Sequence, residues 1–278
     1  MELAQQAERS IIKKYRRGIW NPFIGAIKDY RLIQEGDRIA VCISGGKDSM
    51  LLAKCIQHLQ KYSEFPFEAE YMVMDPGYNA ENRRQIEENA EKLAIPVRIF
   101  ETDIFNIVSK MERSPCYLCA RMRRGYLYKY AQELGCNKIA LGHHFDDAIE
   151  TILMSMLYGA EVRTMMPKLH SKNFPGMELI RPLYHVKEAD ILAWRRYNGL
   201  AFIQCACRFT EDAAQDHSVS KRQEMKDLIA QLRKTNPNVD KNIFHSVENV
   251  NLETVIGYYK GEELHHFLDD YETEGKNL

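Results

Sequence analysis

The first group of residues suited to chemistry in this sequence is a loop in which two glycines are followed by a lysine and an aspartate. The loop lies between an apolar run and a stretch of helical spacing, and it reads Ser44-Gly45-Gly46-Lys47-Asp48-Ser49. Free backbone N–H groups and the dipole at a helix start attract phosphate. The spacing is not that of a Walker A loop, which would need glycine at Val41 and a hydroxyl residue at Asp48. A serine–glycine turn would explain the glycines but not the charged pair, so we expect a nucleotide phosphate site.

A second polar group follows another short apolar run and combines histidines with two acidic residues. It reads Leu141-Gly142-His143-His144-Phe145-Asp146-Asp147. Acidic residues in a first helical turn commonly serve only as partners of the helix dipole. Beside a phosphate loop they could instead position Mg²⁺ or the molecule that reacts with the nucleotide, and we favour this interpretation.

The candidate site therefore draws on both segments and on one further acid, Asp75, which ends a third apolar run. Asp75 is a weaker candidate for an adenosine pocket. The residues expected to carry the chemistry are Lys47, Asp48, Asp146 and Asp147. The residues expected to bind the nucleotide are Ser44, Gly45, Gly46, Lys47, Asp48, Ser49, Asp75, Gly142 and His143.

Two cysteines, Cys116 and Cys119, have the spacing at which thiolates share one metal ion or cluster. Neighbouring arginines would favour the thiolate form. A redox pair would need only these two residues, whereas a zinc site would need two more ligands, which Cys205 and Cys207 could supply. The remaining cysteines lie in apolar contexts typical of buried thiols: Cys42, Cys55 and Cys136.

Short apolar runs that alternate with helical patterns must position these groups. Strands are predicted at residues 38–43, 69–74, 97–100 and 138–141, and each is followed by a helical pattern. Parallel strands need helical crossovers, so this alternation predicts an α/β fold with a parallel sheet covered on both faces. Ligands of such sheets bind at the carboxyl ends of the strands, where the two glycine segments fall.

The chain is expected to have four parts. An N-terminal helical segment at 1–36 precedes a nucleotide-binding α/β domain at 37–185. A helical region at 186–260 follows and contains Cys205 and Cys207, and residues 261–278 form an acidic tail.

Composition limits the partners that the whole molecule could attract. The chain has 278 residues and a net charge of −1, so any affinity for nucleic acid must come from local patches. Residues 110–129 hold six basic residues against Glu112, and the first twenty residues form a second basic patch. No apolar run approaches the roughly 18 residues that span a bilayer. We therefore expect a cytoplasmic protein with reduced thiols and no membrane partner.

The nucleotide loop resembles the PP-loop of the ATP pyrophosphatases, which cleave ATP between the α and β phosphates. The segment at 141–151 is similar to the Gly-His-x-x-Asp-Asp-x-x-Glu-Thr motif of the tRNA-modifying members. Pro-Cys-Tyr-Leu-Cys-Ala-Arg-Met-Arg-Arg-Gly at 115–125 and Arg-Pro-Leu at 181–183 are similar to segments of the tRNA 2-thiocytidine synthetases. The likeness covers about residues 20–250.

This resemblance implies the fold of the adenine nucleotide alpha hydrolases, with ATP and Mg²⁺ as cofactors, and adenylation of C2 of a tRNA cytidine at position 32. It also implies a [4Fe-4S] cluster on three cysteines, which match Cys116, Cys119 and Cys207. At residues 205–207 the family's Cys-x-x-Cys is shortened here to Cys-Ala-Cys, so Cys205 remains an alternative ligand, and a four-cysteine zinc site remains an alternative to the cluster. A cysteine desulfurase or another sulfide donor and a second copy of the chain are the other implied partners.

Three rival functions remain open. A uridine thiolase would use the same chemistry on another base, and a lysidine synthetase would use lysine as the nucleophile without needing Cys116 and Cys119. A nucleotide-responsive iron–sulfur or zinc protein would bind ATP without releasing pyrophosphate.

Overall fold

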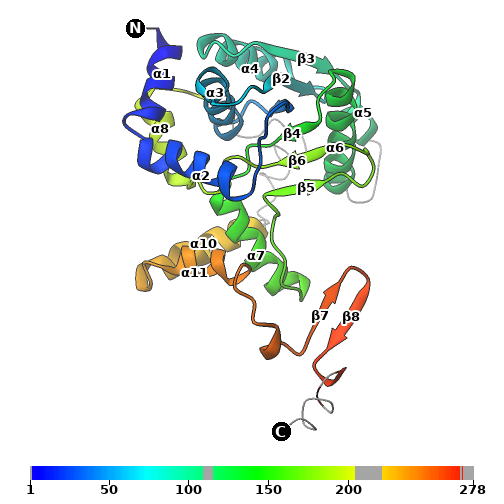
Figure 1. Ribbon diagram of the computed structural model, residues 1–278. Coiled ribbons are helices and arrows are strands. Elements are labelled where there is room, and N and C mark those ends of the chain that lie inside the picture. The colour runs from blue at the N-terminus through cyan, green and yellow to red at the C-terminus, as the bar shows by residue number, and fades with distance from the viewer. Residues whose placement is uncertain (1, 109–114, 204–220, 270, 272–278) are drawn as a thin grey trace.

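A six-stranded sheet forms the centre of the protein in a computed structural model that describes residues 2–108, 115–203, 221–269 and 271 (Figure 1). The strand order is β3-β2-β1-β4-β6-β5, and all neighbouring pairs are parallel except β5 with β6. The strands are β1 Arg38–Ile43, β2 Glu68–Asp75, β3 Val97–Glu101, β4 Lys138–Ala140, β5 Lys168–His170 and β6 Glu178–Ile180. The predicted α/β fold and its four strands are confirmed, whereas β5 and β6 were not predicted.

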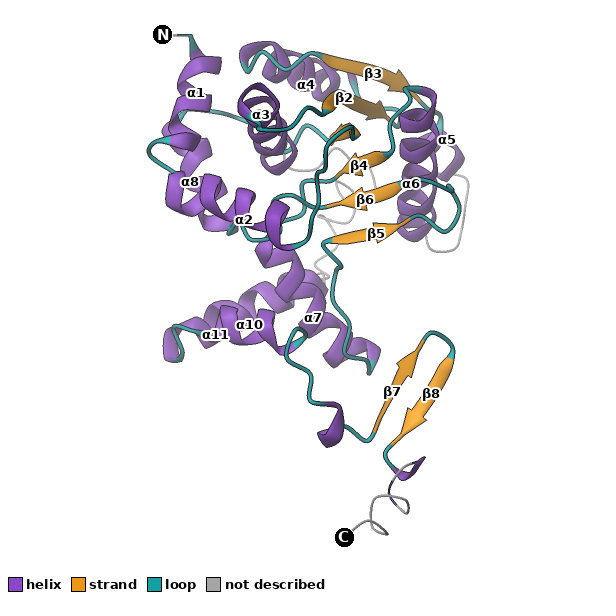
Figure 2. Ribbon diagram, viewed as in Figure 1, coloured by secondary structure: helices purple, strands orange, loops and turns teal. Residues whose placement is uncertain are grey.

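Helices cover both faces of the sheet, as Figure 2 shows. They are α1 Leu3–Ile12, α2 Asn21–Asp29, α3 Lys47–Tyr62, α4 Ala80–Lys92, α5 Ile104–Val108, α6 Pro115–Glu133, α7 Phe145–Gly159, α8 Glu188–Tyr197, α10 Lys221–Thr235 and α11 Val239–Ser246, with a π-helical turn at Arg16–Trp20 and a 3₁₀ turn at Leu252–Thr254. Alternate residues of β1 serve the two layers, because side chains along a strand point to opposite faces. Ile39 and Val41 pack with α3, and Ala40 and Cys42 pack with α6.

The first helices share the main hydrophobic core with the sheet. Ile11, Phe23 and the fully buried Trp194 of α8 all belong to that core, together with β1 and α3. The residues on either side of the predicted boundaries at 36 and 185 are therefore packed in one core. No helix in the described part of the chain is long and apolar enough to cross a membrane.

The last part of the chain differs from the helical region and tail that we expected. After α10 and α11, which pack against α7, an arm at residues 247–269 leads away from the sheet (Figure 1). The arm contains an antiparallel hairpin, β7 Gly257–Lys260 and β8 Glu263–His266. Gly261, with φ of +70°, lies in its turn. The predicted boundary between 260 and 261 thus falls inside a hairpin, and residues 263–266 form a strand.

The sheet has a switch point between β1 and β4. From β1 the chain adds β2 and β3 on one side, and it then crosses over to place β4 on the other side. The connections after β1 and β4 therefore diverge, which opens a crevice at the carboxyl ends of these two strands.

Candidate functional site

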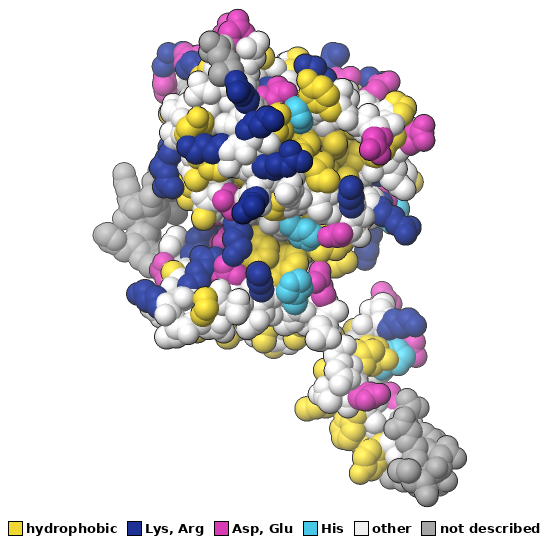
Figure 3. Space-filling model, turned by 60° about the vertical axis from the view of Figure 1, so that its left-hand side comes forward, with side chains coloured by type: hydrophobic (Ala, Val, Ile, Leu, Met, Phe, Trp, Pro, Cys, Tyr) yellow, Lys and Arg dark blue, Asp and Glu magenta, His cyan; other side chains and the backbone are white. Residues whose placement is uncertain are grey.

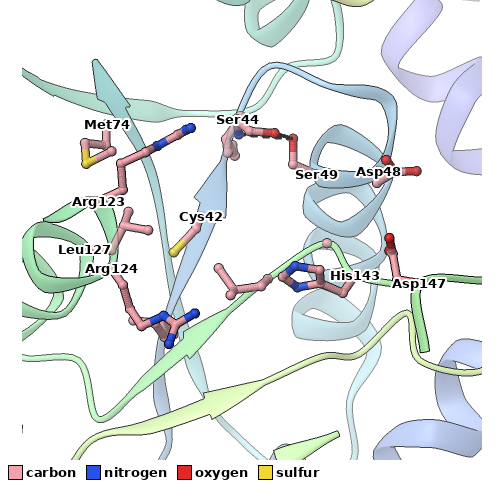
Figure 4. Close-up of a pocket in the computed structure, with 14 residues that line it drawn as sticks. Cys42, Ser44, Asp48, Ser49, Met74, Arg123, Arg124, Leu127, His143 and Asp147 are labelled. Atoms are coloured by element: carbon pink, nitrogen blue, oxygen red, sulfur yellow. Dashed lines mark hydrogen bonds between the residues drawn. The ribbon is translucent and has the colours of Figure 1, made fainter. Parts of the chain in front are cut away.

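A cavity of about 420 Å³ lies at this switch point (Figure 4). It brings the end of β1 and the loop after it together with the end of β4, the start of α7 and one face of α6. Its lining residues are Cys42, Ile43, Ser44, Asp48, Ser49, Met74, Arg123, Arg124, Leu127, Ile139, Leu141, Gly142, His143 and Asp147. Six of the predicted site residues thus meet in one place: Ser44, Asp48, Ser49, Gly142, His143 and Asp147.

The nucleotide loop is held in shape by its own serine. The Ser49 hydroxyl donates to the carbonyl of Gly46 at 3.0 Å and accepts from the backbone N–H of Ser44 at 3.2 Å. Gly45 has φ of +84°, a conformation that favours glycine. Gly46 caps the start of α3, so the first N–H groups of that helix lie at the loop, where an anion binds well.

Gly142 allows the segment after β4 to pass directly against the start of α3. A Cβ at this position would lie 2.9 Å from the backbone nitrogen of Ser49 and 3.0 Å from the carbonyl carbon of Asp48. Both contacts are to backbone, so a larger residue would have to displace the nucleotide loop.

We expect Gly142→Ala to weaken ATP binding at least tenfold and to lower the free energy of unfolding by about 1–3 kcal/mol, the usual cost of overpacking. Isothermal calorimetry and chemical denaturation measure the two effects. Gly125→Ala is the matched control, because nothing lies within 4 Å of a Cβ built on Gly125 in α6. Wild-type ATP affinity in Gly142→Ala would show that the close approach is not needed for the site.

Lys47 begins α3 and is held between two carboxylates. Its Nζ lies 3.1 Å from Asp48 Oδ2 and 3.0 Å from Glu188 Oε1 at the start of α8. Burial raises the pKa of Glu188, but the hydrogen bond and charge of Lys47 outweigh it and bring the pKa to about 2. Lys47 is therefore a fixed positive charge at the loop, although it does not itself line the cavity.

Cations from α10 continue this ion network. Lys226 lies 3.3 Å from the second oxygen of Glu188, and Arg222 lies 3.5 Å from Asp147 and 3.2 Å from the buried Glu150. Burial is the largest cause that raises the pKa of Glu150, to about 7. Sequence reasoning missed Glu188, Arg222 and Lys226, because nothing local to them signals a contact with the nucleotide loop.

The two consecutive aspartates of α7 have different surroundings. Asp147 lines the cavity and accepts from the backbone N–H of His144 at 2.9 Å. Asp146 accepts from the backbone N–H of Glu188 at 2.7 Å and from Arg233 at 2.8 Å. Asp146 is absent from the cavity lining and instead joins α7 to α8 and α10.

Asp75 also has its oxygens occupied. It accepts from the backbone N–H groups of Gly77 and Tyr78 at 2.8 and 2.7 Å, and it pairs with Arg83 at 2.6 Å. It does not line the cavity. Its role in an adenosine pocket remains a prediction, and its observed contacts shape the turn after β2.

His143 is placed to act as a neutral ring in the cavity. Burial and then the charge of Arg181 lower the pKa of His143 below its ordinary value. Its Nδ1 is buried, and it has no hydrogen-bond partner in the part of the chain that the structure describes. A base or sugar in the cavity could therefore satisfy this atom. The neighbouring His144 caps α7, since its Nδ1 accepts from the N–H of Asp147 at 3.4 Å.

The cysteine segment begins α6 and leads directly to the cavity. Cys119 is 5% exposed and packs with Met74, Ile104 and Phe105. Arg123, one helical turn further along α6, lines the cavity. Cys116 lies three residues before Cys119 in the same helix. The helix before β4 therefore includes both cysteines.

The predicted third ligand, Cys207 or its alternative Cys205, lies outside the described residues. Ile203, the last described residue before this segment, lies against the nucleotide loop, since a Cβ on Gly45 would lie 2.6 Å from Ile203 Cδ1. The described residues contain no group of three or more His, Cys, Asp and Glu side chains able to hold a metal ion. The cluster on Cys116, Cys119 and Cys207, with Cys205 as the alternative ligand, stays a prediction.

The chain is similar in sequence to proteins of one known family. The family model described as the PP-loop domain matches residues 19–229. The chain belongs to the PP-loop family. The tRNA-cytidine(32) 2-sulfurtransferase of Syntrophotalea carbinolica is 39% identical over 81% of this chain and 86% of that protein. The enzyme of the same name from Anaeromyxobacter dehalogenans is 32% identical over 93% of this chain and 87% of its own length.

A solved structure supports the fold assignment. The U34-tRNA thiolase NcsA from Methanococcus maripaludis, determined with its [4Fe-4S] cluster, superposes with a TM-score of 0.65. It is 21% identical and covers 93% of this chain and 87% of its own. The family match and this superposition confirm the PP-loop fold predicted from the sequence. The sequence identities to the tRNA-cytidine(32) 2-sulfurtransferases confirm the predicted resemblance to tRNA thiolases.

Proposed function

We propose that this chain is an ATP-dependent tRNA sulfurtransferase that converts a cytidine, at position 32 of the anticodon loop, to 2-thiocytidine. The observation that carries this proposal is the cavity at the switch point, which is walled by the nucleotide loop on one side and by the helix of Cys116 and Cys119 on the other. The names of the relatives that match most of the chain support the choice of cytidine.

In this proposal the first half of the reaction takes place at the nucleotide loop. The C2 carbonyl oxygen of the cytosine attacks the α-phosphorus of ATP, and pyrophosphate leaves with the electron pair of the bond that breaks. Lys47 and the N–H groups at the start of α3 stabilise the negative charge that develops on the leaving group. Asp48 and Asp147 are the cavity carboxylates able to hold Mg²⁺.

The second half replaces oxygen by sulfur. A sulfide sulfur attacks C2 of the adenylated base, the C2–O bond breaks, and AMP carries away the oxygen. A [4Fe-4S] cluster on Cys116, Cys119 and Cys207 would supply an iron that binds this sulfur. Arg123 and Arg124, which extend from the cysteine helix into the cavity, would hold the AMP phosphate in place. The sulfur comes from a cysteine desulfurase or another sulfide donor in the cytoplasm, where thiols stay reduced.

Mass spectrometry of nucleosides tests the proposal. Anaerobically purified protein is incubated with unmodified tRNA, ATP, Mg²⁺ and sulfide, and the tRNA is then digested. We expect 2-thiocytidine at position 32 and one AMP for each thiolated tRNA. The appearance of 2-thiouridine or lysidine would replace this proposal with one of its rivals. ATP binding without any pyrophosphate release would favour the non-catalytic rival.

We further propose that two copies associate through the arm at residues 247–269. Apolar side chains of the arm face solvent, and Ile256 and Tyr259 are 75% and 71% exposed (Figure 3). A lone two-stranded hairpin is marginally stable, so such an arm needs a partner surface. The same chain offers an uncovered apolar surface at the end of α7, on Leu157, Val162 and Met166.

Charge supports a second copy as the partner of the arm. The arm carries five acidic residues against Lys260, whereas the connection at 160–168 has Arg163 and Lys168 against Glu161. In a twofold-symmetric dimer, the arm of each copy would cover the apolar surface at the end of α7 of the other copy. The same contact would therefore be made twice, as in isologous interfaces.

Tyr259→Asp should convert a dimer to a monomer, with at least a tenfold weaker association, because it introduces a charge into an apolar contact. Light scattering after size exclusion measures the mass over a range of protein concentrations. Tyr62→Asp, at an exposed tyrosine that ends α3, is the matched control and should stay dimeric. A Tyr259→Asp protein with unchanged mass would exclude the arm from the interface.

A further inference from the structure

A second hollow of about 970 Å³ opens beside the cavity, between α6 and the connection from β5 to β6. We call it the α6–β5 groove. Its lining residues are Arg121, Arg124, Gly125, Tyr128, Leu169, His170, Ser171, Lys172, Asn173 and Phe174. Arg124 lines both the groove and the cavity, so a ligand with one end in the cavity could extend into the groove.

The groove presents uncompensated positive charge. Arg121, Arg124 and Lys172 are exposed, and within the described ranges none of the three forms an ion pair. On α4, by contrast, the exposed Arg84 pairs with Glu81 and Glu88 at 2.8 and 3.0 Å. Free cations along one hollow favour a polyanion as the ligand.

The wall formed by the connection from β5 to β6 is held firmly. Phe174 stacks on Tyr128 of α6, with ring centroids 5.1 Å apart and planes 15° apart. The backbone N–H of Ser171 donates to the carbonyl of Met177 at 2.8 Å, and the Ser171 hydroxyl accepts from the N–H of Phe174 at 3.2 Å. These contacts fix Lys172 and Asn173 opposite Arg121, so ligand binding need not order this loop.

We propose that the α6–β5 groove binds the sugar–phosphate backbone of the tRNA next to the nucleotide whose base enters the cavity. The proposal rests on the proposed function, since a polymeric substrate must continue beyond the reaction cavity. Arg121 and Lys172 match phosphates, and Asn173 offers an amide to a ribose hydroxyl. The aromatic rings of the groove stack on each other, so it reads the backbone rather than the bases.

Binding of an unmodified anticodon stem-loop over a range of salt concentrations tests the groove. The double variant Arg121→Gln/Lys172→Gln leaves Arg124 and the cavity unchanged. We expect it to weaken stem-loop binding at least tenfold at about 0.1 M salt and to reduce the salt slope by about 2, one for each lost phosphate contact. The KM for tRNA should rise by the same factor with kcat unchanged, and Arg121→Lys/Lys172→Arg should restore most of the affinity.

Arg84→Gln is the control, because it removes an exposed arginine that carboxylates already neutralise. An unchanged salt slope in the groove variant would overturn the inference, whether or not the wild type makes 2-thiocytidine. Loss of stem-loop binding in the variant, with no thiolation by the wild type, would support the groove and overturn the proposed function. A comparable loss in Arg84→Gln would show a general charge effect and would also overturn the inference.

Discussion

Replacing Lys47 by methionine should lower the rates of pyrophosphate release and of 2-thiocytidine formation by about 100-fold to 1000-fold, the usual effect of removing one fixed charge-stabilising donor. Lys47 is held at 3.0–3.1 Å by Asp48 and Glu188, so its ammonium group is in position before the nucleotide arrives. Methionine keeps the length and the apolar stem but not the charge. A coupled pyrophosphate assay and nucleoside mass spectrometry measure the two rates.

The loss should appear without unfolding. Glu188 keeps Lys226 as a partner at 3.3 Å in the variant, so the start of α8 stays attached to α10. Lys61→Met is the matched control, because Lys61 lies in the last turn of the same helix and is exposed to solvent. Pyrophosphate release at the wild-type rate in Lys47→Met would show that the loop lysine does not stabilise the leaving group.

The part of the fold that could be predicted is the part with strong local patterns. The apolar run at 38–43, the two glycines after it and the helical spacing after Lys47 all lie within about twenty residues and point to the same structure. By contrast, β5 and β6 are three residues each, too short to show any period, and β6 pairs with β4 only through the tertiary fold. The hairpin of the arm was missed because solvent-exposed residues of its two strands are apolar. Exposed strand residues are expected to be polar.

The sequence predicts which residues belong to the site, but not the directions in which their side chains point. Asp146 and Asp147 are adjacent in the sequence, yet successive helical residues point about 100° apart, given 3.6 residues per turn. Only Asp147 therefore faces the cavity, while Asp146 is directed to Arg233. No sequence pattern selects between the two, because the choice depends on the rotation of α7 against the sheet.

The ion network around Lys47 could not be predicted for a different reason. Glu188 and Lys226 are far from the loop in sequence, and each lies in a helix whose charge pattern is that of an ordinary solvated face. Their contacts attach α10 to the nucleotide loop and to α7 through ion pairs. Because α10 is the first described element after residues 204–220, this network joins the nucleotide site to the segment that contains Cys205 and Cys207.

Cys119→Ser should remove the bound iron and abolish 2-thiocytidine formation, while pyrophosphate release changes less than about tenfold. Cys119 is buried against Met74 and Phe105, one helical turn before Arg123 of the cavity. Serine keeps the size of the side chain but is a poor ligand for iron, which clusters hold through thiolates. Iron and sulfide analysis, the visible absorption of anaerobically purified protein and the two activity assays measure the effect.

Cys136→Ser is the matched control, since Cys136 is equally buried, at 5% exposure, but packs in a separate cluster with Tyr128 and Leu179. It should keep its iron and its activity. Cys207→Ser and Cys205→Ser then identify the third ligand, because only the ligand's loss should reproduce the Cys119→Ser result. If Cys119→Ser kept its iron and its activity, sulfur delivery in this chain would not depend on the cysteine helix. A colourless wild type with one zinc would instead favour a four-cysteine site, in which all four variants lose the metal.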